Sequence, residues 1–265
     1  MQRRKFIQTT IGGSMALAFG GLKNIRKTHY ISLSFDDGFK KSFYRIAEIH
    51  EEYGLKACLN VIATGHLPNF KAEPKWIPQR LLGSFDDWNA LSERGHEIMP
   101  HSWKHLNLTK ISFENAKDNI EKCIDCFNEN LSGYSSIGAV YNFAYNASNP
   151  ELEDFALTKF SAIRTWAGLV LNDTMINKFP VHELPLRLGC WTYGPDLSDF
   201  YVEQEVEKFL DSEGGWLILN LHGLDNEGWG PISSKYLDSL LRRLIKIDFL
   251  KISPTGELVK QLCCI

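Results

Sequence analysis

Long runs of basic residues are missing from this chain beyond its first 27 positions, and the formal net charge is −3. A protein that binds nucleic acid through its phosphates needs a cluster of lysine and arginine side chains. We therefore expect no nucleic-acid partner. Internal repeats and low-complexity segments are missing from the same part of the chain, which excludes a repeat architecture.

Cysteine is sparse, with six residues at positions 58, 123, 126, 190, 263 and 264 of the 265. This density is too low for a disulfide scaffold, although an exported protein could form disulfides. Cys123 and Cys126 form a C-x-x-C motif, but a second pair that could complete a zinc site is missing. We interpret both as small apolar side chains that pack in the interior.

The first 28 residues differ from the rest. Arg3 and Arg4 precede a mostly apolar run over residues 11–22, which contains Ala16 and Ala18 at a spacing that a signal peptidase needs. This pattern predicts a signal peptide of the twin-arginine type, too short for a stable membrane anchor. We expect export to the periplasm or beyond the cell, no stable membrane span after signal removal, and one catalytic domain over residues 29–265.

Strand-like and helix-like segments alternate through that domain. Strands are predicted at 30–35, 57–62, 97–99, 139–143, 162–165 and 217–221, helices at 41–53, 85–93, 113–131, 150–160, 198–212 and 233–245, and loops at 64–82 and 188–199. Such alternation is typical of an α/β fold with a parallel sheet, either open or closed into a barrel. The chain length suits a single α/β barrel.

Polar residues with catalytic potential follow three of these strands. Asp36 and Asp37 follow the first, His101 follows residues 97–99, and His222 follows residues 217–221. Because reactive side chains of parallel barrels gather at the carboxyl ends of the strands, these residues are expected to meet.

The two adjacent carboxylates have two interpretations. Asp before glycine is common in a plain turn, as in Asp37-Gly38. Two carboxylates side by side in a pocket, however, require a cation or a shared proton. Asp86 and Asp87 repeat the pair without glycine at a probable helix start, where acids suit the helix dipole, so that pair is interpreted as structural.

His101 and His105 are four residues apart. On a helical turn this spacing places both imidazoles on one face, where they can bind one metal ion together with a carboxylate. Such a site leaves coordination positions open for water and substrate. The competing interpretation is a pair of solvent-exposed histidines, and the nearby His96 is either a neighbour of the site or purely structural.

These segments together resemble the polysaccharide deacetylase family, also called the NodB-homology group or carbohydrate esterase family 4. The matching motifs are Ser34-Phe35-Asp36-Asp37-Gly38, His101-Ser102-Trp103-Lys104-His105 and Leu221-His222. The resemblance covers residues 29 to 260 and implies a distorted (β/α) barrel of about seven parallel strands. It also implies a hydrolase that removes acetyl groups, N- or O-linked, from a polysaccharide.

The resemblance assigns a role to each motif residue. Asp37, His101 and His105 would bind a divalent metal, with zinc expected first and cobalt or nickel as alternatives. Asp36 would be the general base and His222 the general acid. Arg164, at the end of a later predicted strand, is expected to brace Asp36 from another direction.

The middle of the chain departs from the family pattern. The usual R-x-P-Y or P-Y-G motif corresponds to Phe143-Ala144-Tyr145-Asn146-Ala147-Ser148. The proline, the aromatic residue that follows it, the glycine and the arginine of the motif are missing there. A backbone N–H near Ala147 could still stabilise an oxyanion. The departure favours a second hypothesis, a glycan-binding or scaffold protein of the same fold with weak or no activity. A third, hydrolysis of an amide in a small metabolite, fits poorly with an export signal.

Overall fold

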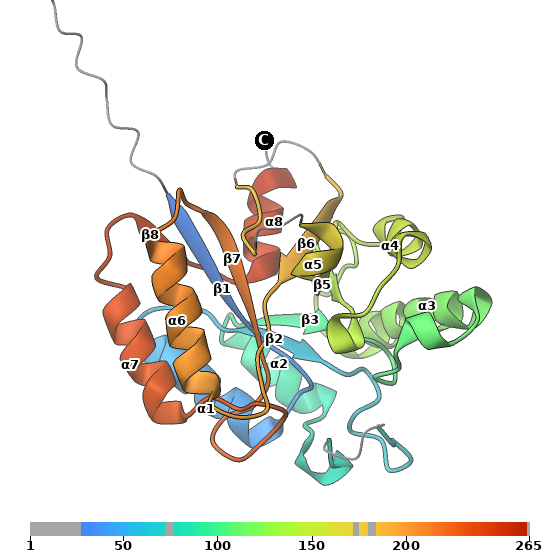
Figure 1. Cartoon of the computed structure of the whole chain (residues 1–265). Helices are drawn as coiled ribbons and strands as arrows, with labels where there is room; N and C mark the ends of the chain where they lie inside the picture. The colour runs from blue at the N-terminus through green and yellow to red at the C-terminus, as the bar shows by residue number, and fades with distance from the viewer. Residues whose placement is uncertain (1–27, 73–76, 172–174, 180–183, 264–265) are drawn as a thin grey trace, which may run out of the picture.

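The computed structural model in Figure 1 describes residues 28–72, 77–171, 175–179 and 184–263. The expected signal peptide, apart from Thr28, lies outside these residues. So do Cys264 and Trp76.

Eight parallel strands form two sheets in the described part of the chain. They are β1 His29–Phe35, β2 Cys58–Val61, β3 Glu97–Pro100, β4 Val140–Asn142, β5 Ala162–Trp166, β6 Leu186–Cys190, β7 Gly215–Leu221 and β8 Leu250–Ile252. The larger sheet has the order β3-β2-β1-β7, with β8 also paired to β1, and the smaller has the order β4-β5-β6. The chain is thus an α/β protein with parallel strands, as the sequence predicts.

The two sheets approach each other at both edges. An isolated parallel bridge joins Trp191, directly after β6, to Leu219 of β7. At the other edge the Asn142 side-chain amide donates to the Pro100 carbonyl at 3.1 Å. The described strands therefore follow the course of a seven-stranded barrel without one continuous backbone ladder, and full closure of the barrel stays a prediction.

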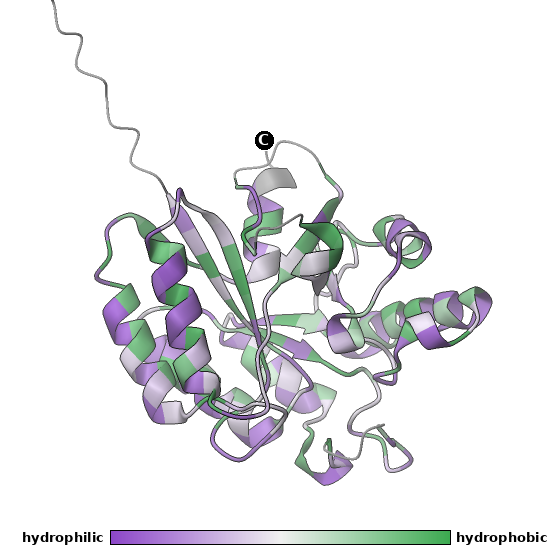
Figure 2. Cartoon of the chain, viewed as in Figure 1, coloured by the Kyte–Doolittle hydropathy of each residue, from purple (hydrophilic) through white to green (hydrophobic). Residues whose placement is uncertain are grey.

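Helices cover the outside of the sheets (Figure 1). They are α1 Lys40–Glu52, α2 Phe85–Glu93, α3 Phe113–Asn130, α4 Pro150–Leu157, α5 Ala167–Val170, α6 Ser198–Leu210, α7 Ser234–Leu244 and α8 Thr255–Cys263. Their surfaces divide into hydrophobic and hydrophilic sides (Figure 2), as expected for helices that pack one side on a sheet. Side chains of Ser112, Asn149 and Ser233 cap the starts of α3, α4 and α7. Within the described ranges, no helix is both long and apolar enough to cross a membrane.

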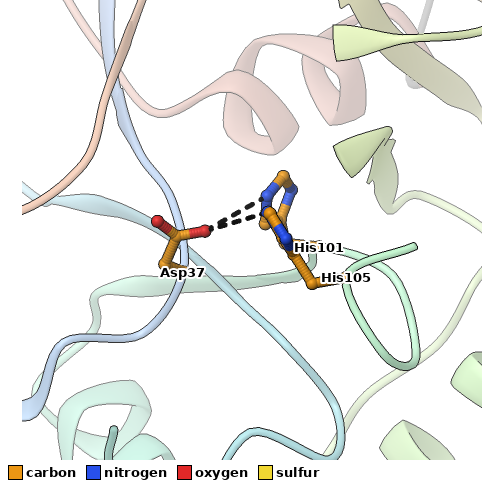
Figure 3. Close-up of side chains that lie close together, drawn as sticks. All are labelled: Asp37, His101 and His105. Carbon is orange, nitrogen blue, oxygen red and sulfur yellow. Dashed lines mark ion pairs between the residues drawn. The ribbon is translucent and has the colours of Figure 1, made fainter. Parts of the chain in front are cut away.

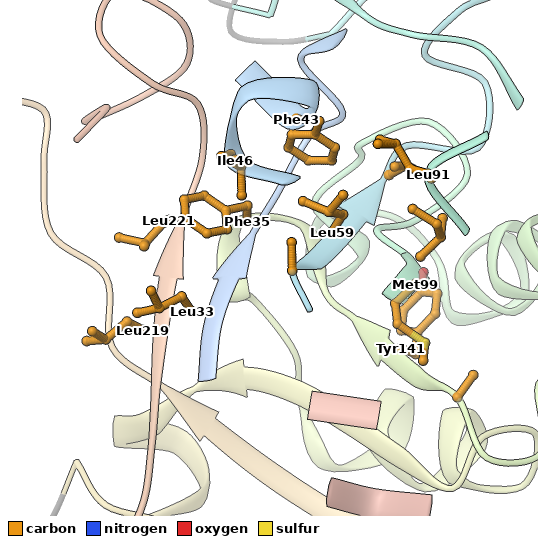
Figure 4. Packing of buried hydrophobic residues seen from close by; sticks show 14 of the residues in the cluster. Leu33, Phe35, Phe43, Ile46, Leu59, Leu91, Met99, Tyr141, Leu219 and Leu221 are labelled. Atoms are coloured by element: carbon orange, nitrogen blue, oxygen red, sulfur yellow. The ribbon is translucent and has the colours of Figure 1, made fainter. Parts of the chain in front are cut away.

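The central strand β1 has two different faces, and both are buried. Ile31, Leu33 and Phe35 pack with α1 and the neighbouring strands in the main core (Figure 4). Ser32 and Ser34 face the other way, because side chains alternate along a strand. Ser34 accepts a hydrogen bond from Asn60 at 2.8 Å and one from Arg164 at 3.2 Å. The inner face of the sheet thus begins a polar network that leads to Asp36.

The sequence predicts six strands and six helices to within a few residues of their observed bounds. Strand β6 is missed, and the prediction of a loop over 188–199 is wrong for residues 188–190. Strand β8 and helices α5 and α8 are also missed. These elements are short, and hydrophobic periodicity needs about 11 residues or more to be recognised. The segment 64–82 is mostly loop in its described part, with one 3-10 turn at Gln79–Leu81.

Buried His50 gives the fold a pH dependence. It lies on α1, its Nδ1 is 2.8 Å from the Ile46 carbonyl, and burial lowers its pKa from 6.5 to about 4. Between these values the unfolded chain binds more protons, so stability falls as the pH drops from about 6.5 to 4. The loss due to His50 is expected to approach about 3 kcal/mol.

Urea unfolding of wild type and His50→Gln at pH 7.5 and pH 4.5 tests this expectation. The glutamine variant should be clearly less stable at pH 7.5 and should lose much less stability on acidification. An equal loss in both proteins would show that His50 does not cause the effect.

Candidate metal centre and active site

The carboxylates of Asp36 and Asp37 are placed by the turn that ends β1. Asp37 has a left-handed backbone with φ of 80°, and Gly38 follows with φ of 92°. A Cβ on Gly38 would also lie 3.2 Å from the Trp88 ring, so this position favours glycine for two reasons. Both carboxylates are buried, each about 1% exposed. Burial at this level excludes the interpretation of Asp36-Asp37 as a plain surface turn.

His101 and His105 lie on the loop that follows β3. The prediction that a helical turn brings them together is wrong, because residues 101–107 form no helix. Instead Ser102 and His105 both have left-handed backbones, with φ of 66° and 53°, and the His105 N–H donates to Ser102 Oγ at 2.8 Å. Such strained backbones gather at functional sites. The loop reaches the predicted pairing by a tight turn that the spacing alone does not reveal.

Both imidazoles point at the Asp37 carboxylate (Figure 3). Asp37 Oδ1 lies 3.5 Å from His101 Nε2 and 3.3 Å from His105 Nε2. One ligand atom from each of the three residues falls within 4.8 Å of the others, and all three side chains are buried. The structure therefore brings together the residues that the sequence predicts as metal ligands.

The donor set fits a divalent metal. His101 Nδ1 is 3.1 Å from the Asn142 carbonyl, and because a carbonyl only accepts, Nδ1 carries the proton and Nε2 presents its lone pair. Among the described residues neither Asp37 oxygen accepts a hydrogen bond of good geometry. A cation between a buried carboxylate and an imidazole lone pair would stabilise both groups, so these residues fit a divalent metal.

Burial acts to raise the Asp37 pKa. Hydrogen bonds and positive charge from His101 and His105, in the state in which a proton rather than a metal ion lies between them and Asp37, outweigh burial and lower this pKa. Asp37 is therefore ionised at neutral pH, as a metal ligand must be.

Asp36 lies at the centre of a hydrogen-bond network. Its Oδ2 accepts from Arg164 Nη2 and from Asn220 Nδ2, both at 2.6 Å, and its Oδ1 accepts from Asn60 Nδ2 at 2.8 Å. Arg164 on β5 is fully buried and reaches Asp36 across the two sheets, as expected. Burial opposes ionisation of Asp36, but the Arg164 charge outweighs it and lowers the Asp36 pKa. Asp36 is thus a carboxylate at neutral pH.

His222 follows β7 and borders the same pocket. The pocket holds about 280 Å³ and is lined by Asp36, His101, His105, Tyr145, Asn146, Thr192, Asn220, His222 and Trp229. Burial lowers the His222 pKa, although Asp37 and Asp36 act to raise it. The Trp229 ring packs edge-on against the imidazole, with centroids 5.7 Å apart. Every predicted site residue therefore either lines this pocket or binds a residue that does.

Several residues of this pocket escape sequence reasoning. Tyr145 supplies the aromatic side chain that the middle segment was expected to lack, and its ring lies 4.7 Å from that of His105. Tyr145 and Asn146 are left-handed in succession, with φ of 60° and 49°. The Ala147 N–H donates to the Ala144 carbonyl at 3.2 Å, so the turn already uses the proposed oxyanion donor. The sequence does give one signal for Asn146, because asparagine tolerates a positive φ better than most residues do.

Other residues singled out in the sequence have structural roles. His96 Nδ1 accepts from the Ala57 N–H at 3.1 Å, and its Nε2 lies 3.1 Å from Glu51, so it is structural. Asp87 accepts from the Ser84 N–H at the start of α2 and pairs with Lys40. Cys58, Cys123, Cys126 and Cys190 are free thiols; Cys126 alone among them is only half-buried.

The polysaccharide deacetylase family model matches residues 23–153 of this chain. This part of the chain is similar to polysaccharide deacetylases. The matched span contains Asp36, Asp37, His101 and His105, whereas Arg164 and His222 lie beyond it. A comparison with curated protein sequences gives no significant match.

Solved structures share the fold of this chain. A candidate polysaccharide deacetylase from Mycobacterium smegmatis has a TM-score of 0.64 at 14% identity, over 90% of this chain and 91% of the other. Peptidoglycan deacetylase PdaC from Bacillus subtilis has a TM-score of 0.52 at 17% identity, over 88% and 92%. A CE4 family pseudoenzyme from Bacillus anthracis has a TM-score of 0.56 at 13% identity, over 88% of this chain and 66% of the other. At these identities the likeness shows the fold alone.

Proposed function

We propose that this protein is a metal-dependent hydrolase that removes acetyl groups, N- or O-linked, from a polysaccharide outside the cytoplasm. The single observation that carries the proposal is the convergence of Asp37, His101 and His105, whose ligand atoms lie within 4.8 Å of one another. Asp36 and His222 border the same pocket. The match of residues 23–153 to the polysaccharide deacetylase family model supports acetylated polysaccharide as the substrate class.

Each side chain has a part in the proposed reaction. Asp37, His101 and His105 would hold the ion, and a divalent ion there would polarise the acyl oxygen and acidify water. Asp36 is ionised and accepts the proton of the attacking water. Arg164 holds the Asp36 carboxylate in place through its 2.6 Å contact. His222, neutral at pH 7 because burial lowers its pKa, takes up the proton that Asp36 has removed from the water and passes it to the leaving amine or hydroxyl.

Acetate release from a panel of acetylated glycans tests the proposal. The panel contains N-acetylated chitohexaose, peptidoglycan and acetylated xylan, each with the protein as purified, after chelation and after addition of zinc, cobalt or nickel. We expect release that chelation abolishes and one of these ions restores, zinc first. Absence of release from every substrate with each ion would contradict the proposal.

Replacement of His222 is expected to separate proton transfer from metal binding. His222→Gln should lower kcat by about 10²- to 10⁴-fold, the usual contribution of a general acid. Metal content should stay at the wild-type level, because His222 is not among the three clustered ligands. His66→Gln is a matched control outside the pocket lining and should keep wild-type kcat. An unchanged kcat in His222→Gln would remove the residue from the mechanism.

Export remains part of the proposal. It is supported by Arg3, Arg4 and the apolar run over residues 11–22, all of which lie outside the described residues. Amino-terminal sequencing of the protein from the periplasm of its host should show a shortened chain that begins after Ala18 and no later than about residue 29. Recovery of the intact chain from the cytoplasm alone would contradict this part.

A glycan-binding or scaffold protein with weak activity is the second candidate. One observation favours it: a solved structure of the same fold, from Bacillus anthracis, is described as a pseudoenzyme. Two outcomes together would support this candidate. They are tight glycan binding without acetate release, and an Asp36→Ala variant that behaves like wild type.

A further inference from the structure

A group of exposed aromatic and apolar side chains lies between β6 and the first turn of α6. We call Tyr193, Leu197, Phe200 and Tyr201 the rim patch. Tyr193 is 38% exposed, Phe200 54% and Leu197 67%. Exposed apolar side chains that gather in one place mark interaction sites, whereas single ones carry no meaning. This group is concentrated within nine consecutive residues, which singles it out.

The rings of the rim patch are held in a fixed arrangement. Tyr193 and Tyr201 have centroids 3.6 Å apart, and Trp191 lies parallel to Tyr193 at 6.0 Å with an interplanar angle of 16°. Trp191 is itself fixed to β7, since its N–H donates to the Ile218 carbonyl at 2.9 Å and its carbonyl accepts from Asn220 at 2.7 Å. The rings are therefore preorganised, which reduces the entropy lost when a ligand binds.

The rim patch is continuous with the candidate active site. Thr192, directly before Tyr193 in the chain, lines the pocket, and its buried Oγ1 has no hydrogen-bond partner among the described residues. Next to it, a Cβ on Gly194 would lie 2.9 Å from the Trp229 ring, which also lines the pocket. A chain-like ligand that leaves the pocket on this side would pass from Thr192 and Trp229 directly to Tyr193.

We propose that the rim patch is a second sugar-binding subsite, which contacts a residue of the glycan beyond the one held in the pocket. This inference rests on the proposed function. Flat aromatic faces stack on the apolar C–H faces of sugar rings, while phenolic hydroxyls bind their polar edges. The acidic side chains of Asp196 and Asp199 are close in sequence and disfavour an anionic membrane surface. Both Asp199 oxygens accept hydrogen bonds from Ser233, so Asp196 is the one offered to sugar hydroxyls.

Calorimetric binding of sugars of different length tests the proposal without relying on turnover. The probes are N-acetylated chitohexaose and acetylated xylohexaose, each beside its monosaccharide, with chelated and with metal-loaded protein. In Tyr193→Ala/Phe200→Ala we expect the Kd of the hexasaccharide that binds to rise about tenfold, and the Kd of its monosaccharide to stay unchanged. Tyr193→Phe, which keeps the ring, should stay within about twofold of wild type. The control is Ile137→Ala, 81% exposed in the turn before β4.

Four outcomes would contradict a sugar-binding subsite at the rim patch, and one would support it without the deacetylase activity. Equal losses for hexasaccharide and monosaccharide, wild-type affinity in the double variant, or no hexasaccharide binding by the wild type would each overturn the subsite. So would concentration-dependent self-association of the wild type that the double variant abolishes, because the patch would then bind a second copy. Length-dependent binding without acetate release would support the subsite and contradict the deacetylase proposal.

Discussion

Asp37→Ala is expected to abolish stoichiometric metal binding and to lower kcat/KM for acetyl release by at least about 10³-fold. The carboxylate is the one anionic ligand of the candidate site, and without it two imidazoles remain. Metal analysis of the dialysed protein and acetate release measure the two effects. Asp86→Ala is the matched control, because Asp86 belongs to the similar Asp86-Asp87 pair and lies exposed on α2.

The reason for so large an effect is the geometry around Asp37 Oδ1. This single oxygen faces both imidazoles, at 3.5 and 3.3 Å, and no other carboxylate in the described residues completes the cluster. Asp36 cannot replace it without giving up its bonds to Arg164 and Asn220. Wild-type metal content and activity in Asp37→Ala would contradict the assignment, whereas equal losses in Asp86→Ala would indicate a nonspecific defect.

Arg164→Met is expected to lower the free energy of unfolding by about 3–5 kcal/mol, measured by urea unfolding in the presence of a chelator. The substitution leaves the Asp36 charge buried with no cation beside it. Arg45→Met is the surface control: Arg45 pairs with Glu48 at 3.2 Å and both side chains are about half exposed, so its loss should cost about 1 kcal/mol or less.

A double variant separates the charge from the packing. In Arg164→Met/Asp36→Leu both charges are absent, and we expect this protein to be more stable than Arg164→Met alone. A single variant that loses less than about 1 kcal/mol would contradict the view that Arg164 neutralises Asp36. A double variant less stable than Arg164→Met would assign the loss to packing rather than to charge.

The sequence was sufficient to predict that the candidate metal ligands lie close together, because the residues that follow buried strands are informative. A buried β-branched or aromatic strand followed by Asp36-Asp37-Gly38 or by His222-Gly223 places polar groups at one edge of a parallel sheet. The backbone conformation that brings these groups together could not be predicted. The His101–His105 pairing depends on two left-handed residues, and the prediction of a helical turn failed because spacing cannot distinguish a helix from a tight loop.

The surroundings of Asp36 are harder to predict for another reason. Asn60, Asn220 and Arg164 come from three different strands, and each is an ordinary polar residue within its own segment. Only the folded arrangement shows that all three donate to one carboxylate. Tyr145 was overlooked because its role depends on a strained backbone rather than on the residue type.

The division of the strands into two sheets has a consequence for how this protein can diversify. Asp37, His101 and His105 follow strands of the β3-β2-β1-β7 sheet, whereas Tyr145, Asn146 and Thr192 follow strands of the β4-β5-β6 sheet. One sheet thus carries the candidate metal ligands, and the other supplies part of the pocket wall that would meet the organic part of a ligand. Mutations can reshape that wall while the ion-binding residues keep their positions. New substrate preferences are therefore accessible without rebuilding the metal centre.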